Sequence, residues 1–168
     1  MRRTGSAWAV ATAMVVLLAI PARAVATTYT SGWTFSAVAH DDAQIALLAF
    51  DGGRLVWSVP SGGGVDLVTE LADQPNTSQV VASSAKLATD EAPFRQVSVA
   101  GDRIVWEAFD GAHWQVHTRK MGVDSAARQV TNESADHSLT KLSGDRAVWL
   151  ARVGTYNQVF TMDLALDG

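Results

Sequence analysis

Apolar and polar residues alternate over short segments along most of the chain, and Gly, Asp and Ser separate these segments. Four such segments are residues 95–100, 103–108, 114–119 and 127–131, which are rich in Val, Ile, Trp, Thr and Gln. Short segments of this composition, bounded by turn residues, predict β-strands. After the first 26 residues, no 20-residue window carries an apolar stripe of helical period. The pattern predicts an all-β protein.

The strand pattern repeats along the chain. The sequence GDRIVW at residues 101–106 recurs as GDRAVW at 144–149 and, in weaker form, as GGRLVW at 52–57. Shifting residues 101–120 by 43 onto residues 144–163 gives identity at 10 of 20 positions. One repeat is therefore about 43 to 49 residues long, and the three repeats place a tryptophan at the same position, as Trp57, Trp106 and Trp149.

Each well-formed repeat contains a Gly-Asp pair between two predicted strands. The pairs begin at Gly101 and Gly144. A glycine at the first central position of a two-residue loop suits a type II′ hairpin, because that position needs a positive φ. We therefore interpret Gly101 and Gly144 as turn residues, and the three repeated tryptophans as core residues rather than as a sugar-stacking ladder.

Adjacent apolar residues such as Val105-Trp106 and Val148-Trp149 predict strands that are covered on both faces. Four short antiparallel strands in about 45 residues, covered by copies of themselves, describe a β-propeller blade. The predicted fold class is therefore all-β, with propeller-type blades of four antiparallel strands.

These repeats resemble those of the TolB-like six-bladed β-propeller family. The resemblance rests on residues 143–149 (SGDRAVW), residues 157–164 (NQVFTMDL) and a closing strand at 129–131, and it covers residues 45–168. It implies a propeller architecture and says little about activity. Similar repeats occur in envelope scaffold proteins and in the propellers that precede prolyl-oligopeptidase-type hydrolases.

The sequence departs from this family in two ways. Residues 58–79 are longer than their counterparts, and their Pro and three consecutive Gly predict an exposed loop. Six blades of this size need about 270 residues, whereas residues 25–168 supply about three, with the third blade predicted to lack its outer strand. We expect a truncated piece of a longer protein; a homodimer that closes the propeller, or an outer strand supplied by residues 28–39, are the alternatives.

The N-terminus has the pattern of a secretory signal peptide. Arg2 and Arg3 precede a 14-residue apolar stretch, and residues 22–24 (ARA) form a small-residue cleavage site. The stretch is too short for a permanent membrane span. We therefore assign residues 1–24 to a signal peptide, residues 25–44 to an N-terminal segment and residues 45–168 to the propeller repeats, and expect a periplasmic, cell-surface or extracellular protein.

Composition excludes several function classes. The formal charge is −4, and cleavage after Ala24 would remove three arginines and no acid, which leaves −7. This charge disfavours a nucleic-acid partner. The absence of cysteine excludes disulfides, thiolate catalysis and thiolate metal sites. No Gly-x-Ser-x-Gly nucleophile motif is present, so no catalytic residue is assigned.

The candidate contact residues lie in the loops that precede the innermost strand of a blade, where propellers open onto their central channel. These loops are acidic, and their candidate residues are Asp90, Glu91, Glu133, Asp136 and His137. Their oxygen atoms would suit a basic peptide or Ca²⁺, the one cofactor considered. The alternative interpretation is an ordinary solvated loop.

Two further sets of residues have simpler interpretations. Arg54, Arg103 and Arg146 follow the three turns and are expected to be rim charges beside Asp102 and Asp145, each contributing little. His113 and His117 are expected to be aromatic packing positions rather than metal ligands, because the next repeat has Tyr156 and Phe160 there.

The sequence thus predicts an exported, non-catalytic β-propeller scaffold that binds a protein or peptide partner at the cell envelope. The alternative is the propeller portion of a larger exported enzyme, either a prolyl-oligopeptidase-type peptidase or a polysaccharide-acting enzyme.

Overall fold

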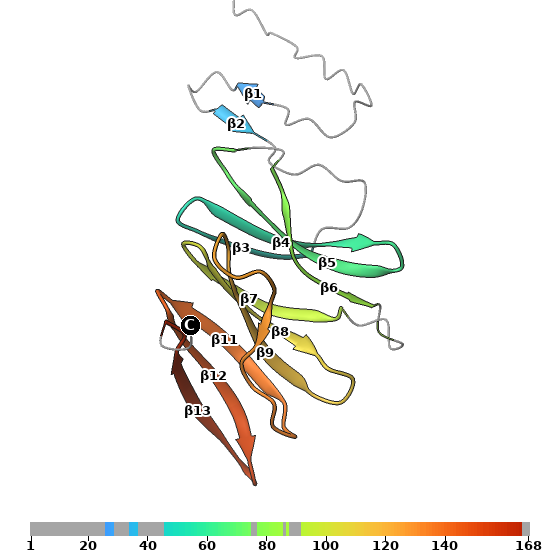
Figure 1. Cartoon of the computed structure of the whole chain (residues 1–168), viewed down its shortest axis with the longest axis vertical. Coiled ribbons are helices and arrows are strands. Elements are labelled where there is room, and N and C mark those ends of the chain that lie inside the picture. Colours follow the sequence, from blue (N-terminus) through green and yellow to red (C-terminus); the bar gives the residue numbers. More distant parts are fainter. Residues whose placement is uncertain are drawn as a thin grey trace, which may run out of the picture.

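Thirteen β-strands make up the secondary structure of the part of the chain described by a computed structural model. That part comprises residues 26–28, 34–36, 46–74, 77–85, 87 and 92–165, and it contains no helix. Three antiparallel sheets follow one another along the chain, and we call them blades 1, 2 and 3 (Figure 1). This confirms the predicted all-β class and the partial propeller of about three blades.

Blades 1 and 2 have four strands and blade 3 has three. Blade 1 consists of β3 (Ala46–Asp51), β4 (Arg54–Ser61), β5 (Gly64–Leu71) and β6 (Gln79–Ala85). Blade 2 consists of β7 (Phe94–Ala100), β8 (Arg103–Phe109), β9 (Trp114–Lys120) and β10 (Arg128–Gln129). Blade 3 consists of β11 (His137–Ser143), β12 (Arg146–Val153) and β13 (Tyr156–Asp163). Each blade is a simple up-and-down sheet in chain order.

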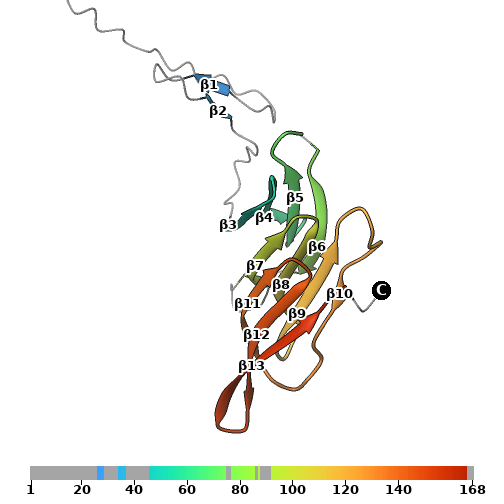
Figure 2. The same cartoon turned by 90° about the vertical axis from the view of Figure 1, so that its left-hand side faces the viewer.

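The first strands of the blades lie next to one another. β7 contacts β3 on one side and β11 on the other, and Figure 2 shows β3, β7 and β11 in succession along the same side of the molecule. The later strands of each blade are therefore the outer ones, as in a propeller. Each strand pair joined by Gly-Asp places its turn at the same end of the inner strand.

The repeated turns have the expected backbone. Ala100 pairs with Arg103 and Ser143 with Arg146, which leaves two-residue loops. Gly101 and Gly144 both have a φ of +56°, a value that a residue with a Cβ adopts only under strain. The first blade differs, because Gly52 and Gly53 both have positive φ. Its turn thus has Gly53 where the other two have an aspartate.

The prediction of an exposed loop at residues 58–79 holds only for the described residues between β5 and β6, because Pro60 and the three glycines lie in a paired hairpin. β4 continues through Pro60 to Ser61, Gly62 and Gly63 make a tight turn, and β5 follows at once in full register with β4. The three glycines supply the turn and a close approach: a Cβ on Gly64 would lie 2.3 Å from the carbonyl oxygen of Ser84. Pro60 is tolerated near the end of its strand, where few ladder bonds are lost.

Each inner strand carries a bulge at the same repeat position. The register shifts between Ala46 and Ala49, between Arg95 and Ser98, and between Ser138 and Lys141. Within each shift one non-glycine residue has a positive φ; these residues are Leu47, Gln96 and Leu139. A bulge bends the strand and increases its twist. Because the bulge recurs in all three blades, it is a regular feature of this repeat.

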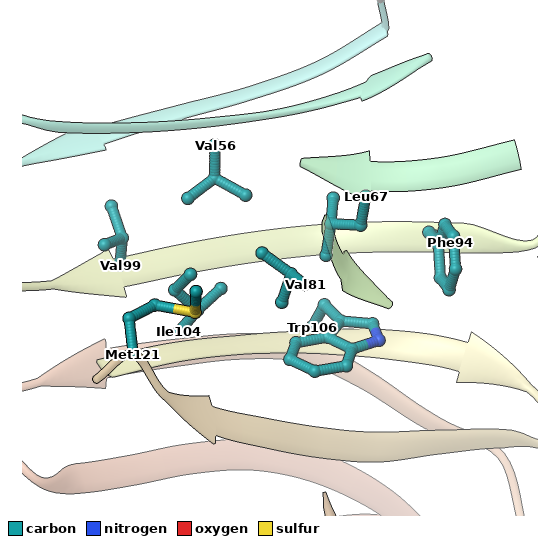
Figure 3. Packing of buried hydrophobic residues seen from close by; sticks show 8 residues of the cluster. All are labelled: Val56, Leu67, Val81, Phe94, Val99, Ile104, Trp106 and Met121. Atoms are coloured by element: carbon teal, nitrogen blue, oxygen red, sulfur yellow. The ribbon is translucent and has the colours of Figure 1, made fainter. Parts of the chain in front are cut away.

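Two apolar clusters hold the blades together. The first, between blades 1 and 2, brings Val56, Leu67 and Val81 against Ile104 and Trp106 (Figure 3). The second, between blades 2 and 3, brings Val105 and Val116 against Ala147, Trp149 and Ala151. Alternation along each strand therefore sends the repeated tryptophan toward the preceding blade and the valine before it toward the following blade. Core packing is the role that we predicted for Trp106 and Trp149.

Within the described residues, no strand follows β13 in blade 3, as predicted. Residues 26–28 and 34–36 form β1 (Ala26–Thr28) and β2 (Thr34–Ser36), which pair with each other and not with β13. The described part of residues 28–39 therefore does not supply an outer strand to blade 3. The predicted signal peptide at residues 1–24 lies outside the described residues, and no helix in the described part is long and apolar enough to cross a membrane.

Candidate functional site

In blades 1 and 2, the arginine that follows the turn reaches across to the next blade. Arg54 donates from Nη2 to Asp102 Oδ1 at 2.5 Å and from Nε to the Gly101 carbonyl at 3.1 Å. Arg103 donates from Nε to Asp145 Oδ1 at 2.6 Å. The side chains of Arg54 and Arg103 are only 9% and 8% exposed. The interpretation of these arginines as rim charges was therefore wrong, because both guanidinium groups lie between blades.

The contact with Arg103 shifts the pKa of Asp145. The hydrogen bond from Arg103 lowers the pKa of Asp145 below its usual value, and the charges of Arg103 and Lys120 act in the same direction. A charge-assisted hydrogen bond to a guanidinium favours the ionised carboxylate. The pair is therefore formed at neutral pH.

The third arginine of the series differs from the first two. Arg146 donates from Nη2 to Asp163 Oδ2 at 3.4 Å, within its own blade, and its side chain is 59% exposed. It lies beside a hollow of about 380 Å³ that is lined by Lys141, Leu142, Ser143, Arg146 and Val148. Arg146 is thus exposed on blade 3, whereas the equivalent arginines of blades 1 and 2 bind the following blade.

The same face exposes apolar side chains that are buried in the other blades. Val148 is 36% exposed, whereas its repeat counterparts Val56 and Val105 are fully buried. Val159 is 75% exposed, and its counterpart Val116 is fully buried. We call the surface formed by Arg146, Val148, Leu150, Val159 and Thr161 the forward face of blade 3. These residues are neighbours because Val148 pairs with Thr161 and Leu150 with Val159.

β13 is also open along its edge. In blade 2, β10 pairs with β9 at Thr118 and His117, Val130 donates its N–H to the Val116 carbonyl at 2.7 Å, and Val116 donates its N–H to Thr131 Oγ1 at 2.9 Å. The 43-residue repeat makes Val159 the counterpart of Val116. Within the described residues, β13 pairs with β12 alone, and Figure 1 shows it at the outer side of its sheet.

The predicted channel-mouth residues are partly brought together. Glu133 and Asp136 have exposed side chains, and each contacts a residue of the segments that begin β9 and β11. Asp136 Oδ1 accepts the Trp114 N–H at 2.9 Å, and Glu133 Oε2 lies 3.3 Å from His137 Nε2. Asp90 and Glu91 lie outside the described residues.

The His137 side chain is buried between Trp114 of blade 2 and Trp149 of blade 3. His137 opens β11, its side chain is 2% exposed, and its Nδ1 lies 3.1 Å from the Trp114 carbonyl. Its ring meets Trp149 edge to face at 6.5 Å between centroids. His137 therefore positions the loop of Glu133 and Asp136 against blade 2, rather than contacting a ligand itself.

A buried carboxylate that sequence reasoning missed joins blades 2 and 3. Glu107 is fully buried, and its Oε1 accepts the N–H and the hydroxyl of Thr140, both at 2.9 Å. Its Oε2 accepts from Arg95 Nε at 2.7 Å, while Arg95 also donates to the His137 carbonyl at 2.9 Å. The Arg95 guanidinium lies 4.0 Å above the Trp114 ring. The following repeat has Leu150 in place of Glu107, so the repeat pattern carried no signal for this network.

His117 occupies an aromatic packing position. Its ring stacks on Trp106 at 5.8 Å, as Phe160 stacks on Trp149 at 6.3 Å in the next blade. Burial lowers the pKa of His117, with the Asp110 charge opposing this shift weakly. Asp110 itself has a lowered pKa because its carboxylate accepts the N–H groups of His113 and Ala112. Across the described residues, no group of three or more His, Asp or Glu side chains is arranged to hold a metal ion.

A groove of about 600 Å³ lies between blades 1 and 2. The groove is lined by Val81 of blade 1 and by Phe94, Trp106, His117 and Arg119 of blade 2. Arg119 bridges the blades, since its Nη1 donates to the carbonyls of Val80 and Val81 at 2.8 and 3.0 Å. Trp106 Nε1 and Arg119 Nε are buried there without a hydrogen-bond partner.

A scan against protein-family models and a search of curated proteins find no match. Solved structures of similar fold do exist, however. A protein assigned as TolB from Agrobacterium tumefaciens superposes with a TM-score of 0.54 at 11% identity, over 84% of this chain and 57% of that one. The β-propeller domain of the Trilobed protease from Pyrococcus furiosus, described as having an open velcro topology, gives 0.57 at 10% identity, over 88% and 43%.

These similarities establish the fold alone, and the chain spans less than two thirds of the length of each relative. They agree with the three sheets seen here and with the resemblance that the Gly-Asp-Arg repeats predicted. The chain is therefore a partial β-propeller, similar in fold to a TolB protein and to the propeller domain of a protease.

Proposed function

We propose that this protein is an exported, non-catalytic β-propeller scaffold that binds a protein or peptide partner through blade 3. The observation that carries the proposal is the edge of β13, which no strand among the described residues covers. Residues 156–161 of this strand are all exposed, whereas every residue of its counterpart β9 is buried or half-buried. Export is inferred from the sequence of residues 1–24 and would place the scaffold at the cell envelope.

The edge of β13 has the features of a strand-accepting site. The strand is eight residues long, and Tyr156, Val159 and Phe160 are exposed on it. The pairing seen between β9 and β10 shows which main-chain groups point outward, and by repeat these are the N–H and carbonyl of Val159. An extended peptide that adds to such an edge gains main-chain hydrogen bonds and covers apolar side chains. A long open edge that stays uncovered is instead an aggregation hazard.

A synthetic peptide tests this proposal directly. Residues 124–132 (DSAARQVTN) contain the strand that covers β9 in blade 2, so this peptide is the natural probe for β13. We expect it to bind residues 25–168 weakly and to slow hydrogen exchange at the Val159 amide. The matched control is the same peptide with Val130→Pro, which lacks the N–H that donates to Val116 in blade 2. Equal binding of both peptides, or of neither, would refute strand addition.

The acidic loop before β11 offers a second contact for a basic partner. Glu133 and Asp136 are exposed, and main-chain N–H donors from Asn132 and Trp114 hold their carboxylates in place. Fixed, exposed carboxylates cost little to order on binding. Once a partner is in hand, Glu133→Gln should weaken its binding in low salt, because charge steering is screened by salt. An unchanged affinity would remove this loop from the site.

The propeller of a larger enzyme remains the second candidate function, favoured by the similarity to the Trilobed protease propeller domain. On this hypothesis the blades would guide substrates to a catalytic domain. The test is hydrolysis of a prolyl peptide reporter by the protein isolated from its native source. Activity that co-purifies with these blades would favour the enzyme, and a preparation that binds its partner without hydrolysis would favour the scaffold.

A further inference from the structure

We propose that the groove between blades 1 and 2 binds an extended peptide segment of about seven residues, which places an acidic side chain beside Arg119, apolar side chains over Trp106 and a basic side chain beside Asp110. Both blades that form the groove are four-stranded, so it lies at a junction inside the chain. The site is separate from the edge of β13 and does not depend on it.

The lining residues follow one another along the length of the groove. Arg119 on β9 pairs with Ile104 on β8, and Asp110 follows the far end of β8. Trp106 lies between these ends, two positions after Ile104. Asp110 is six positions after Ile104, which corresponds to about 20 Å of extended strand. The groove therefore has a cation near one end, an aromatic floor in the middle and an anion near the other end.

Two buried donors in the groove have no acceptor. Among the described residues, Trp106 Nε1 and Arg119 Nε are without a hydrogen-bond partner, which is unfavourable for a buried N–H. Figure 3 shows the indole nitrogen on the Phe94 side of the Trp106 ring, away from Ile104 and hence from the Arg119 end. An extended chain can offer a carbonyl oxygen to one donor and an acidic side chain to the other. Because both atoms are buried, a small side-chain movement accompanies binding.

The two ends of the groove complement opposite charges. The Arg119 guanidinium donates from Nη1 and Nη2 to three main-chain carbonyls. These acceptors carry no net charge, so a carboxylate at Nε adds the charge-assisted bond that a guanidinium favours. At the other end, Asp110 is exposed, and two main-chain N–H groups hold its Oδ1 at 2.8 Å. A peptide with an acidic residue at one end and a basic residue at the other matches both.

The outer strand of blade 1 forms one wall of the groove and has an open edge. Within the described residues, β6 pairs with β5 alone, and residues 80–84 of β6 line the groove. The Val80 carbonyl accepts a hydrogen bond from Arg119, so β6 runs from the Arg119 end of the groove toward the other end. An extended peptide beside this edge gains main-chain hydrogen bonds in addition to the contacts of its side chains.

A designed peptide of matching length and charge serves as the probe. In acetyl-KSVSVSE-amide, alternate side chains point to one face, so the lysine, both valines and the glutamate face the groove together. Its lysine and glutamate are about 20 Å apart in an extended chain. The matched control is acetyl-KSVSVSQ-amide, which lacks only the acidic charge. Binding is followed by NMR at the Trp106 indole N–H, whose resonance is assigned by its loss in Trp106→Phe.

We expect KSVSVSE to shift the Trp106 indole resonance and KSVSVSQ to bind roughly threefold to tenfold more weakly. Arg119→Gln should remove this difference by weakening KSVSVSE alone. Its matched control is Arg152→Gln, at an exposed arginine of blade 3, which should leave both affinities unchanged. Trp106→Phe removes one donor and should weaken both peptides, whereas Trp149→Phe should weaken neither. The Tm of each variant shows whether it is folded.

Three results would overturn the inference. Equal affinities of the natural protein for the two peptides would show that no acidic group is recognised beside Arg119, and this comparison needs no variant. Binding of KSVSVSE that shifts the Val159 amide instead of the Trp106 indole would place the peptide on β13, which supports the proposed function and not this groove. Binding of neither peptide would also contradict the inference, while leaving the β13 edge to its own test.

Discussion

Arg103 of blade 2 and Asp145 of blade 3 form a 2.6 Å hydrogen-bonded ion pair across the junction of the two sheets. The two residues are 42 positions apart and repeat, one blade later, the relation between Arg54 and Asp102. A single ion pair of this type contributes only modestly to the free energy of unfolding. The pair matters mainly for position, because it fixes the turn that precedes β12 in blade 3 against the start of β8 in blade 2.

This pair predicts an acid-dependent part of the stability. The pKa of Asp145 is lowered in the folded protein, so its contribution is complete above the unfolded pKa near 4 and is lost as the pH falls through the folded pKa. We expect Asp145→Asn to have a flatter Tm profile than the parent between about pH 5 and pH 2. Parallel Tm profiles for the two proteins would contradict this assignment.

The buried Glu107 predicts a large mutational effect. Glu107→Ala should lower the free energy of unfolding by about 3–5 kcal/mol, since it leaves Arg95 and the Thr140 donors without their acceptor. Glu107→Gln keeps an acceptor oxygen and should cost about 1–2 kcal/mol. Urea unfolding measures both. Asp163→Asn, at a half-buried carboxylate that lies 3.4 Å from Arg146, is the control and should change stability by less than about 0.5 kcal/mol.

The inner-strand bulge predicts which of two substitutions at Gln96 gives the more stable protein. Gln96 has a φ of +51°, a conformation that costs a residue with a Cβ about 1–2 kcal/mol. Gln96→Gly should therefore be more stable than Gln96→Ala by about 1 kcal/mol, even though glycine loses more entropy on folding. Thermal unfolding of the two variants decides the point. The opposite order would mean that the bulge is relaxed in solution.

His117 predicts a second pH effect that is separate from the first. Its pKa is lowered by burial, so it stabilises the fold above its unfolded pKa near 6.5 and the stability falls as the pH drops below that value. His117→Phe copies the Phe160–Trp149 stack of the next blade. We expect this variant to lose less Tm than the parent between pH 7.5 and pH 5. An equal loss in both proteins would show that other groups control this range.

The sequence predicted the repeats, the Gly-Asp turns and the buried tryptophans because each of these is recorded in local residue identity. Gly101 marks its turn through a φ that other residues avoid. Along β8, Arg103, Val105 and Glu107 face blade 3, whereas Ile104 and Trp106 face blade 1. Because Arg103 is two residues before Val105, the alternation of a strand already places this arginine on the face that contacts the next blade.

Other features carried no local signal. Pro60 and three glycines were interpreted as a loop, although they lie in a tightly paired hairpin, because tertiary pairing outweighs local propensity. No glycine marks the bulges at Leu47, Gln96 and Leu139. The burial of Glu107 and His137 depends on contacts with another blade, which no short segment records. The open forward face of blade 3 became clear only by comparison with the buried valines of the earlier blades.

Hydrogen exchange at two equivalent amides tests the open edge of β13 most directly. The Val116 N–H is bonded to Thr131 Oγ1 at 2.9 Å and lies beneath an outer strand, whereas the Val159 N–H lies 43 residues later on a strand that pairs on one side only. Residue-resolved NMR exchange on residues 25–168 should show slow exchange at Val116 and fast exchange at Val159, with Val159 slowing when the 124–132 peptide is added. Equal protection of both amides in the isolated protein would contradict the open blade on which the proposed function depends.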